Sequence, residues 1–169
     1  MYKTPLSFLG PLGGKRILLY GLGLDALAFA LAGADVYGFD RSGNRVEALK
    51  DLARGMGLRE RTHLQTAEME RLAYPGNFFD LAYGRILREE GDLVSGTEEL
   101  NRVLKLGGRA AFVIRSRSPL VEPVQRAFGS AVVGDDCWIG VEKSRTRTER
   151  ATGRIRTDDR SITNRELYP

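Results

Sequence analysis

A short apolar run that leads directly into a glycine loop restricts the fold of this chain more than any other feature. The run Arg16–Tyr20 reads R-I-L-L-Y, and Gly21-Leu22-Gly23 follows it at once. The next residues repeat at the spacing of an amphipathic helix, which Gly33 ends: Leu24, Leu27, Ala28 and Leu31. A buried strand, a glycine turn and a helix in this order predict an α/β fold with a parallel sheet.

The acid that follows the glycine loop indicates a ligand. Asp40 ends the next strand-like run, Asp35–Asp40, 19 residues after Gly21. Glycines let a ligand approach the backbone closely, and a carboxylate at the end of the second strand accepts hydrogen bonds from both ribose hydroxyls. Loop and acid together predict an adenosine-type ligand at the carboxyl edge of the sheet. The alternatives are a tight turn without a ligand, and a nicotinamide site in which Asp40 selects NAD over NADP.

The rest of the pattern predicts strands that alternate with helices, and therefore a mostly parallel sheet with right-handed crossovers. Helices are predicted between Val46 and Met56, after a Ser95–Glu98 capping box, and from Pro119 to Phe128. Further strands are predicted at His63–Gln65, Phe78–Tyr83, Arg109–Ile114, Ala131–Val133 and Trp138–Lys143. The last two read as a hairpin. The predicted fold is a Rossmann-like three-layer sandwich whose seven-stranded sheet ends with an antiparallel strand.

Charge divides the chain into a nearly neutral domain and a basic tail. Residues 1–143 are predicted to form the domain and residues 144–169 a disordered extension, which carries seven arginines against four acids and most of the net charge of +4. The neutral domain argues against nucleic acid as a partner. No apolar run of 18 residues predicts a membrane span, and Cys137 is the only cysteine. With no signal peptide in the pattern, a cytoplasmic protein is expected.

Four stretches between Lys15 and Lys143 carry a family resemblance. The first combines Ile17–Asp25 with Val36–Ser42, and the second, Ala67–Asp80, is similar to Gly-Asp-Ala-x-x-Leu-Pro-Phe-x-x-x-x-Phe-Asp. The third, Glu98–Val113, is similar to a helix, a Lys-Pro-Gly-Gly turn and a fifth strand, and the fourth is the terminal hairpin. In this order they resemble the class I S-adenosylmethionine-dependent methyltransferases, particularly the small-molecule type. The resemblance implies S-adenosylmethionine as the cofactor rather than a dinucleotide.

The resemblance assigns cofactor contacts to the first half of the chain. Gly21 and Gly23 fall on the loop that wraps the methionine part of the cofactor, and Asp40 falls on the ribose-binding acid. Arg41 falls where the family usually has an apolar residue against adenine. A guanidinium plane can stack on the base at that position instead.

Three more assignments follow the third and fourth predicted strands. Glu68 falls on the acid that accepts a hydrogen bond from the adenine amino group. Met69 falls where a backbone N–H meets an adenine ring nitrogen. Tyr83, with Gly84 after it, falls beside the methyl-transfer site.

Two residues depart from the family pattern at the loop itself. Tyr20 stands where the family usually has an acid that helps to hold the amino group of the cofactor, and Asp25 stands where it usually has a third glycine. Asp25 is expected mainly as a helix cap, and partial replacement of the missing acid is the alternative. Both departures bear on cofactor affinity rather than on the fold.

No residue is assigned to catalysis. The stretch Tyr83–Glu90 lacks an Asn-Pro-Pro-Tyr type motif, which argues against methylation of adenine or glutamine amino groups. Arg88 stands where the family often has a histidine. Glu89 and Glu90 are expected at a solvated helix end, and a role as a base is the alternative. His63, the only histidine, is expected to be structural, so no metal site is predicted.

The small size of the chain leaves its activity open. Only residues 115–129 separate the fifth strand from the hairpin, so there is little material to enclose a substrate. The site is expected to be open, shared in a homodimer or with a partner subunit, or not catalytic. The leading hypothesis is a methyltransferase for an unidentified small-molecule acceptor. The alternatives are a degenerate relative that binds the cofactor weakly or serves as a noncatalytic subunit and, third, an NAD-binding protein.

Overall fold

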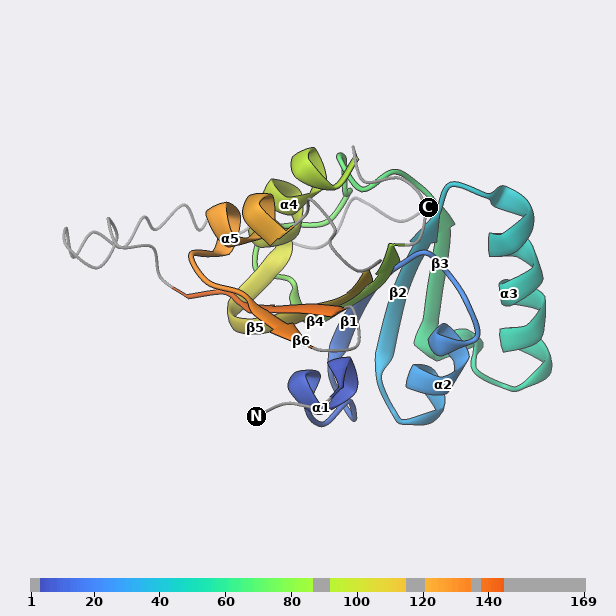
Figure 1. The fold of residues 1–169 in the computed structure, drawn as a ribbon. Coiled ribbons are helices and arrows are strands. Elements are labelled where there is room, and N and C mark those ends of the chain that lie inside the picture. The colour runs from blue at the N-terminus through green and yellow to red at the C-terminus, as the bar shows by residue number, and fades with distance from the viewer. Residues whose placement is uncertain (1–3, 87–91, 115–120, 135–137, 145–169) are drawn as a thin grey trace.

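A seven-stranded sheet runs through the described residues, and Figure 1 shows how the helices are arranged around it. The computed structural model describes residues 4–86, 92–114, 121–134 and 138–144. The strands are β1 (Arg16–Tyr20), β2 (Asp35–Asp40), β3 (Thr62–Thr66), β4 (Phe79–Ile86), β5 (Leu104–Ile114), β6 (Val132–Gly134) and β7 (Trp138–Glu142). The helices are α1 (Pro5–Leu9), α2 (Asp25–Leu31), α3 (Gly43–Gly55), the 3-10 turn η1 (Arg59–Arg61), α4 (Asp92–Val103) and α5 (Val121–Phe128).

The strand order is β3-β2-β1-β4-β5-β7-β6. Strands β1 to β5 pair in parallel, whereas β7 is antiparallel to both of its neighbours. The chain runs from β1 outward to β3, and then crosses back to β4 on the other side of β1. This topology confirms the predicted Rossmann-like fold with a reversed last strand.

Helices cover both faces of the sheet (Figure 1). Two layers of buried apolar side chains lie between the helices and the sheet. The layer under α1, α2 and α3 includes Phe8, Leu27, Phe29, Val46 and Leu49. The layer under α4 and α5 includes Leu100, Val103, Val124 and Phe128. Since β1 lies between them and carries buried Ile17, Leu18 and Leu19, its carboxyl end is held from both faces.

The glycine loop is anchored by its central side chain. Leu22 is buried, and its side chain occupies the space that a Cβ on Gly38 of β2 would need. Leu64 of β3 lies 2.8 Å from the same Cβ position. The glycine in the middle of β2 therefore lets the loop after β1 pack onto the neighbouring strands.

Two local predictions were wrong. The Ser95–Glu98 capping box does not start a helix, because α4 begins at Asp92 and includes both residues. The Gly107-Gly108 pair lies within β5 rather than before it, and the pairing with β4 changes register between Phe79 and Leu81. A Cβ on Gly108 would lie 2.8 Å from the Lys105 carbonyl oxygen, so the glycine permits this irregularity.

Helix α1 was not predicted, although its ends carry clear signals. Thr4 and Ser7 form a reciprocal capping box, Pro5 occupies the first turn, and Gly10 follows with a φ of 81°. Phe8 and Leu9 attach this helix to the core. No helix in the described part of the chain is long and apolar enough to cross a membrane. The predicted tail, apart from Ser144, lies outside the described residues.

Candidate cofactor site

The carboxyl ends of four parallel strands form the edge where the predicted site residues gather. Tyr20 ends β1, Asp40 ends β2 and Thr66 ends β3, with the end of β4 on the other side of β1. Strand order reverses between β1 and β4, and ligands of open α/β sheets bind at such a switch point. The glycine loop follows β1 and therefore lies at this point.

Backbone geometry requires a glycine at position 21. Gly21 has a φ of 73°, and a Cβ there would lie 2.8 Å from the carbonyl oxygen of Arg85 in β4. Gly23 is under no such constraint, because a Cβ on it would meet only side-chain atoms, at 3.7 Å or more. Gly21 is therefore needed for the conformation of the loop. Gly23 is not, and without a Cβ it leaves the loop backbone partly exposed.

Asp40 lies beside this loop and is bonded to it. Asp40 is 5% exposed, and its carboxylate accepts hydrogen bonds from the backbone N–H of Leu22 at 3.0 Å and of Ser42 at 2.8 Å. Arg45, at the start of α3, donates to the same oxygen as Leu22 at 2.8 Å. A carboxylate offers about four lone-pair positions, so these bonds leave room for one more donor.

The segment after β3 approaches the end of β2. Ala67 donates its backbone N–H to the carbonyl oxygen of Asp40 at 3.2 Å. The Glu68 side chain is exposed, whereas Met69 is buried against Gly96 of α4. The Met69 side chain is therefore held in the core.

Arg41 lies next to Asp40 and forms an ion pair across to this segment. Its guanidinium is 3.5 Å from a carboxylate oxygen of Glu70, and its side chain is partly exposed. The structure thus brings the assigned ribose acid and the assigned adenine contacts to neighbouring strand ends.

Tyr83 is the assigned residue that lies apart from this group. Its side chain is 9% exposed and packs edge-on against Phe29 of α2, with 5.4 Å between ring centroids. Burial, and then the nearby Asp25 carboxylate, raises the pKa of its phenol. The neutral hydroxyl group is therefore retained at physiological pH. Residues 87–91, which include Arg88, Glu89 and Glu90, lie outside the described residues.

The predicted helix cap at Asp25 is wrong. Leu24 occupies the N-cap position of α2, and no side chain caps this helix. The Asp25 carboxylate instead accepts a hydrogen bond from Arg85 at 3.3 Å. Tyr20, where the family acid was expected, packs against Phe39 with ring centroids 5.2 Å apart.

Two arginines at this edge were missed by sequence reasoning. Arg45 bonds Asp40, and Arg85 bonds Asp25 across 60 residues. Arg45 had a usable signal, because it lies at the third position of the helix that Ser42 caps, directly beyond Asp40. For Arg85 the only signal in the sequence was its position directly after Gly84, at the expected end of the fourth strand.

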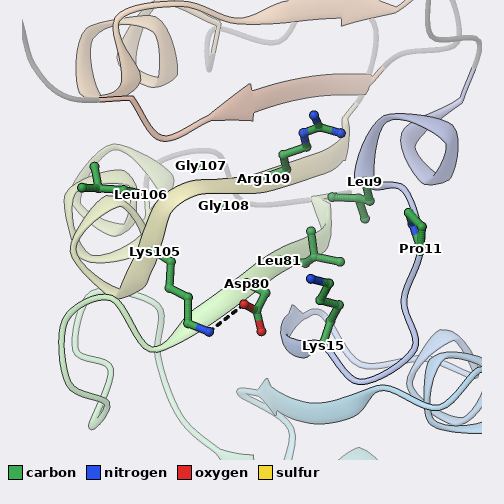
Figure 2. A pocket seen from close by; sticks show the side chains of 10 residues that line it. All are labelled: Leu9, Pro11, Lys15, Asp80, Leu81, Lys105, Leu106, Gly107, Gly108 and Arg109. Atoms are coloured by element: carbon green, nitrogen blue, oxygen red, sulfur yellow. Dashed lines mark hydrogen bonds and ion pairs between the residues drawn. The ribbon is translucent and has the colours of Figure 1, made fainter.

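A cavity of about 360 Å³ opens at the opposite edge of the sheet. Figure 2 shows its lining: Leu9, Pro11, Lys15, Asp80, Leu81, Lys105, Leu106, Gly107, Gly108 and Arg109. These residues lie at or near the amino ends of β1, β4 and β5. The cavity is therefore separated from the glycine loop by the length of β1, which is about 16 Å for five residues.

Asp80 is the central charge of this second edge. It accepts hydrogen bonds from Lys105 at 2.6 Å and from the backbone N–H of Arg16 at 2.9 Å. Burial opposes ionisation of Asp80, but these two bonds and the nearby ammonium groups outweigh it and lower its pKa. Within the described residues no group of His, Cys, Asp and Glu side chains is arranged to hold a metal ion.

Comparison with known proteins assigns the chain to a family. A family model described as a methyltransferase domain matches residues 18–112, from β1 into β5. Because the match covers more than half of the chain and the fold agrees, the chain belongs to the class I S-adenosylmethionine-dependent methyltransferase family. No curated protein sequence matches the chain significantly.

Solved structures show the same likeness. YcgJ of Bacillus subtilis is 30% identical, with a TM-score of 0.53 over 58% of this chain and 43% of that one. The [4+2]-cyclase SpnF is 31% identical, with a TM-score of 0.54 over 59% of this chain and 38% of that one. A SAM-dependent methyltransferase from Aquifex aeolicus shares the fold, with 18% identity and a TM-score of 0.62 over 79% of this chain and 83% of that one. The match to YcgJ and SpnF thus spans about two fifths of their length.

Proposed function

We propose that this chain binds S-adenosylmethionine across the ends of β2, β1 and β4 and transfers its methyl group to a small-molecule acceptor. The bond between the Asp40 carboxylate and the Leu22 N–H carries the proposal. It holds an acid at the side of a glycine loop, at the switch point of the sheet, with one lone pair still open. Ribose hydroxyls are the donors that such an acid accepts.

The residues present fit the cofactor from ribose to adenine. Asp40 would accept from the ribose, and exchange of Arg45, whose side chain is 55% exposed, would free a second position. Arg41 would stack on adenine, Glu68 would accept from its amino group, and the Met69 N–H would meet a ring nitrogen. The bound cofactor supplies a sulfonium methyl group, so the protein has to align an acceptor with it and exclude competing nucleophiles.

We assign Tyr83 to the part of the site that would bind the methyl acceptor. It is the assigned residue nearest to the end of β4, and its buried ring stays neutral. A neutral phenol at this strand end would position an acceptor by packing or a hydrogen bond and would not act as a base. We place the protein in the cytoplasm, with the acceptor site completed by a second copy or a partner subunit.

The second candidate is a relative that retains the cofactor site without methyl transfer. Tyr20 in place of the family acid favours it, and so does the likeness to SpnF, which is named as a cyclase. The family assignment and the mostly parallel sheet with its reversed strand favour neither candidate over the other. Together they remove the case for a nicotinamide dinucleotide.

Titration calorimetry with S-adenosylmethionine, S-adenosylhomocysteine and NAD tests cofactor binding. Both adenosyl ligands are expected to bind and NAD is not. Asp40→Ala is expected to abolish binding, because the ribose then loses its charged acceptor. Asp35→Ala is the matched control, since Asp35 lies at the other end of β2 and pairs weakly with Arg61 at 3.7 Å.

Three results would count against the proposal. Absence of heat with both adenosyl ligands at millimolar concentration would refute cofactor binding. Unchanged affinity in Asp40→Ala would refute the ribose assignment. Tight binding without methyl transfer to any acceptor in a panel of small molecules would favour the noncatalytic candidate.

A further inference from the structure

An irregularity in β5 builds one wall of the cavity at the amino edge of the sheet, the amino-edge cavity. Leu104 of β5 lies opposite Phe79 of β4. The next pair along the two strands joins Arg109 to Leu81, so β5 advances by five residues where β4 advances by two. The extra residues lie within Lys105–Gly108, which lines the cavity. Bulges of this kind redirect side chains, and they are frequent beside functional sites.

The size of the amino-edge cavity suits a small molecule. Its volume is about 360 Å³, at the lower end of the range for small-molecule sites, which is roughly 300 to 1000 Å³. Leu9 of α1 and Pro11 after it line the cavity together with β4 and β5. A ligand there would therefore contact the first helix and the sheet at the same time.

Positive charge exceeds negative charge among the described residues that line this cavity. Its charged members are Lys15, Asp80, Lys105 and Arg109. Figure 2 shows the ammonium groups of Lys15 and Lys105 directed toward Asp80, whereas the Arg109 guanidinium points away from it. Arg109 pairs with Glu142, outside the lining, at 3.1 Å. Two ammonium groups therefore face one carboxylate, which leaves one positive charge unmatched.

Lys15 carries the unmatched charge. It is exposed, and within the described residues its ammonium group has no hydrogen bond or ion pair. The Asp80 carboxylate is already bonded to Lys105 at 2.6 Å and to the backbone N–H of Arg16 at 2.9 Å. An ammonium group has three donors, and Lys105 uses one of them on Asp80. Donors from both lysines are thus open to a second carboxylate.

The uncharged side chains of the lining are apolar. Leu9 and Leu81 are buried, whereas Pro11 is exposed. Leu106, on the bulge, is 54% exposed although its side chain is large and apolar. Covering such a surface with another apolar group is favourable, because it removes both from water. The cavity therefore offers an apolar wall beside its ammonium groups.

We propose that the amino-edge cavity binds an organic carboxylate that has a small apolar body. The carboxylate accepts hydrogen bonds from the ammonium groups of Lys15 and Lys105. The apolar body packs against Leu9, Leu81 and Leu106. An inorganic anion lacks this body, and a neutral molecule leaves Lys15 unmatched. The cavity and the glycine loop lie at opposite edges of the sheet, so the inference goes beyond the proposed function and does not depend on it.

Two fluorinated ligands of the same shape test the inference. 4-(Trifluoromethyl)benzoate has a carboxylate on an apolar ring, and 4-(trifluoromethyl)benzamide has a neutral amide in its place. Fluorine NMR titration of the 169-residue chain is expected to show binding of the benzoate, with the amide about tenfold weaker. Acetate and inorganic phosphate lack the ring and are expected to displace the benzoate only at concentrations about tenfold higher.

Two variants are expected to shift the affinity for the benzoate in opposite directions. Lys15→Gln should weaken it about tenfold, the effect of losing one bond between charged groups. Asp80→Asn should strengthen it about fivefold, because a like charge is removed and the Lys105 ammonium is released. A variant that only loosened the fold would not raise the affinity, so the gain in Asp80→Asn separates binding from a structural role.

Matched controls address the position of the probe and the apolar wall. Lys50→Gln removes an exposed lysine from a pair with Glu47 on α3 and is expected to leave the affinity unchanged. Leu106→Ala should weaken the benzoate about threefold and leave acetate unchanged, because it shortens the apolar wall alone. Thermal unfolding of each variant shows whether the chain remains folded.

Loss in Lys15→Gln together with gain in Asp80→Asn supports the inference. Absence of benzoate binding at millimolar concentration overturns it, and so does equal binding of the amide, which would mean that charge is not recognised. Wild-type affinity in Lys15→Gln would place the probe elsewhere. Tighter binding of phosphate than of the benzoate would replace the proposed ligand class with an inorganic anion. None of these results bears on cofactor binding at the other edge.

Discussion

The two edges of the sheet carry the same kinds of ion pair but use them differently. At the amino edge, Asp80 with Lys105 joins β4 to β5, and Arg109 with Glu142 joins β5 to β7. These strands are already hydrogen-bonded to one another, so the pairs strengthen existing contacts. At the carboxyl edge, the pairs of Asp40 and Asp25 involve a loop or the first turn of a helix.

The two edges differ in the backbone that surrounds the charged side chains. Asp80 is bonded to a backbone N–H inside the sheet and has a lowered pKa. Asp25 and Arg85 instead lie beside Gly23, in a loop whose backbone conformation requires glycine at position 21. Pairs at the amino edge join neighbouring strands, whereas the pairs beside the glycine loop join a helix start to a strand end.

The largest effect is expected from a methyl group at Gly21. Gly21→Ala must place a Cβ 2.8 Å from a backbone oxygen, with φ at 73°. We expect the free energy of unfolding to fall by about 3 kcal/mol, the upper end for such backbone strain. Urea unfolding measures the change.

Gly57→Ala is the control for this prediction. Gly57 also has a positive φ, 69°, but no atom lies within 4 Å of its Cβ position. We expect a loss of about 1 kcal/mol from strain alone. Equal losses in the two variants would show that the contact with Arg85 does not shape the loop.

A smaller effect is expected at the amino edge. The pKa of Asp80 is lower in the folded chain than its usual value, so its stabilisation is complete above the unfolded pKa and is lost as the pH falls through the folded pKa. Asp80→Asn should therefore lower the free energy of unfolding at pH 7 by about 1 kcal/mol and flatten its decline in acid.

Cofactor affinity should be unaffected by Asp80→Asn, since the two edges are separated by the length of β1. Asp51→Asn, in an exposed pair on α3, provides the comparison and should change stability by less than about 0.5 kcal/mol. A weakened cofactor affinity in Asp80→Asn would contradict the separation of the two edges.

The smallest effect is expected at Arg45. Arg45 bonds one oxygen of Asp40 and is 55% exposed at its side chain, so under the proposed function it would compete with the ribose for that oxygen. Arg45→Gln should therefore increase the affinity for S-adenosylhomocysteine about two- to threefold while leaving the unfolding midpoint unchanged. A weaker affinity would show that Arg45 contacts the ligand rather than competing with it.

Much of the fold could be predicted because its signals are local. The bounds of β1 and β2 follow from apolar runs ended by Gly21 and Asp40, and both strands were predicted with their observed limits. The start of β5 was misplaced because Gly107 and Gly108 read as a turn, whereas the pairing with β4 keeps them within the strand. Tertiary pairing overrode a valid local signal there.

The candidate site could be predicted only where its residues lie close together in the sequence. The loop and Asp40 could be found from spacing, but the Asp25–Arg85 pair joins residues 60 positions apart. The choice between a cap and an ion pair at Asp25 depended on where β4 ends in space. That information resides in the register of β1 with β4, which pairs Tyr20 with Gly84.

The close approach of the Arg85 carbonyl to Gly21 joins two parts of the site mechanically. The loop and the last residues of β4 share a backbone contact without side chains between them, so neither can shift without displacing the other. A ligand that fixes the end of β4 would therefore also fix the loop, and a ligand on the loop would favour binding at the end of β4 in equal measure.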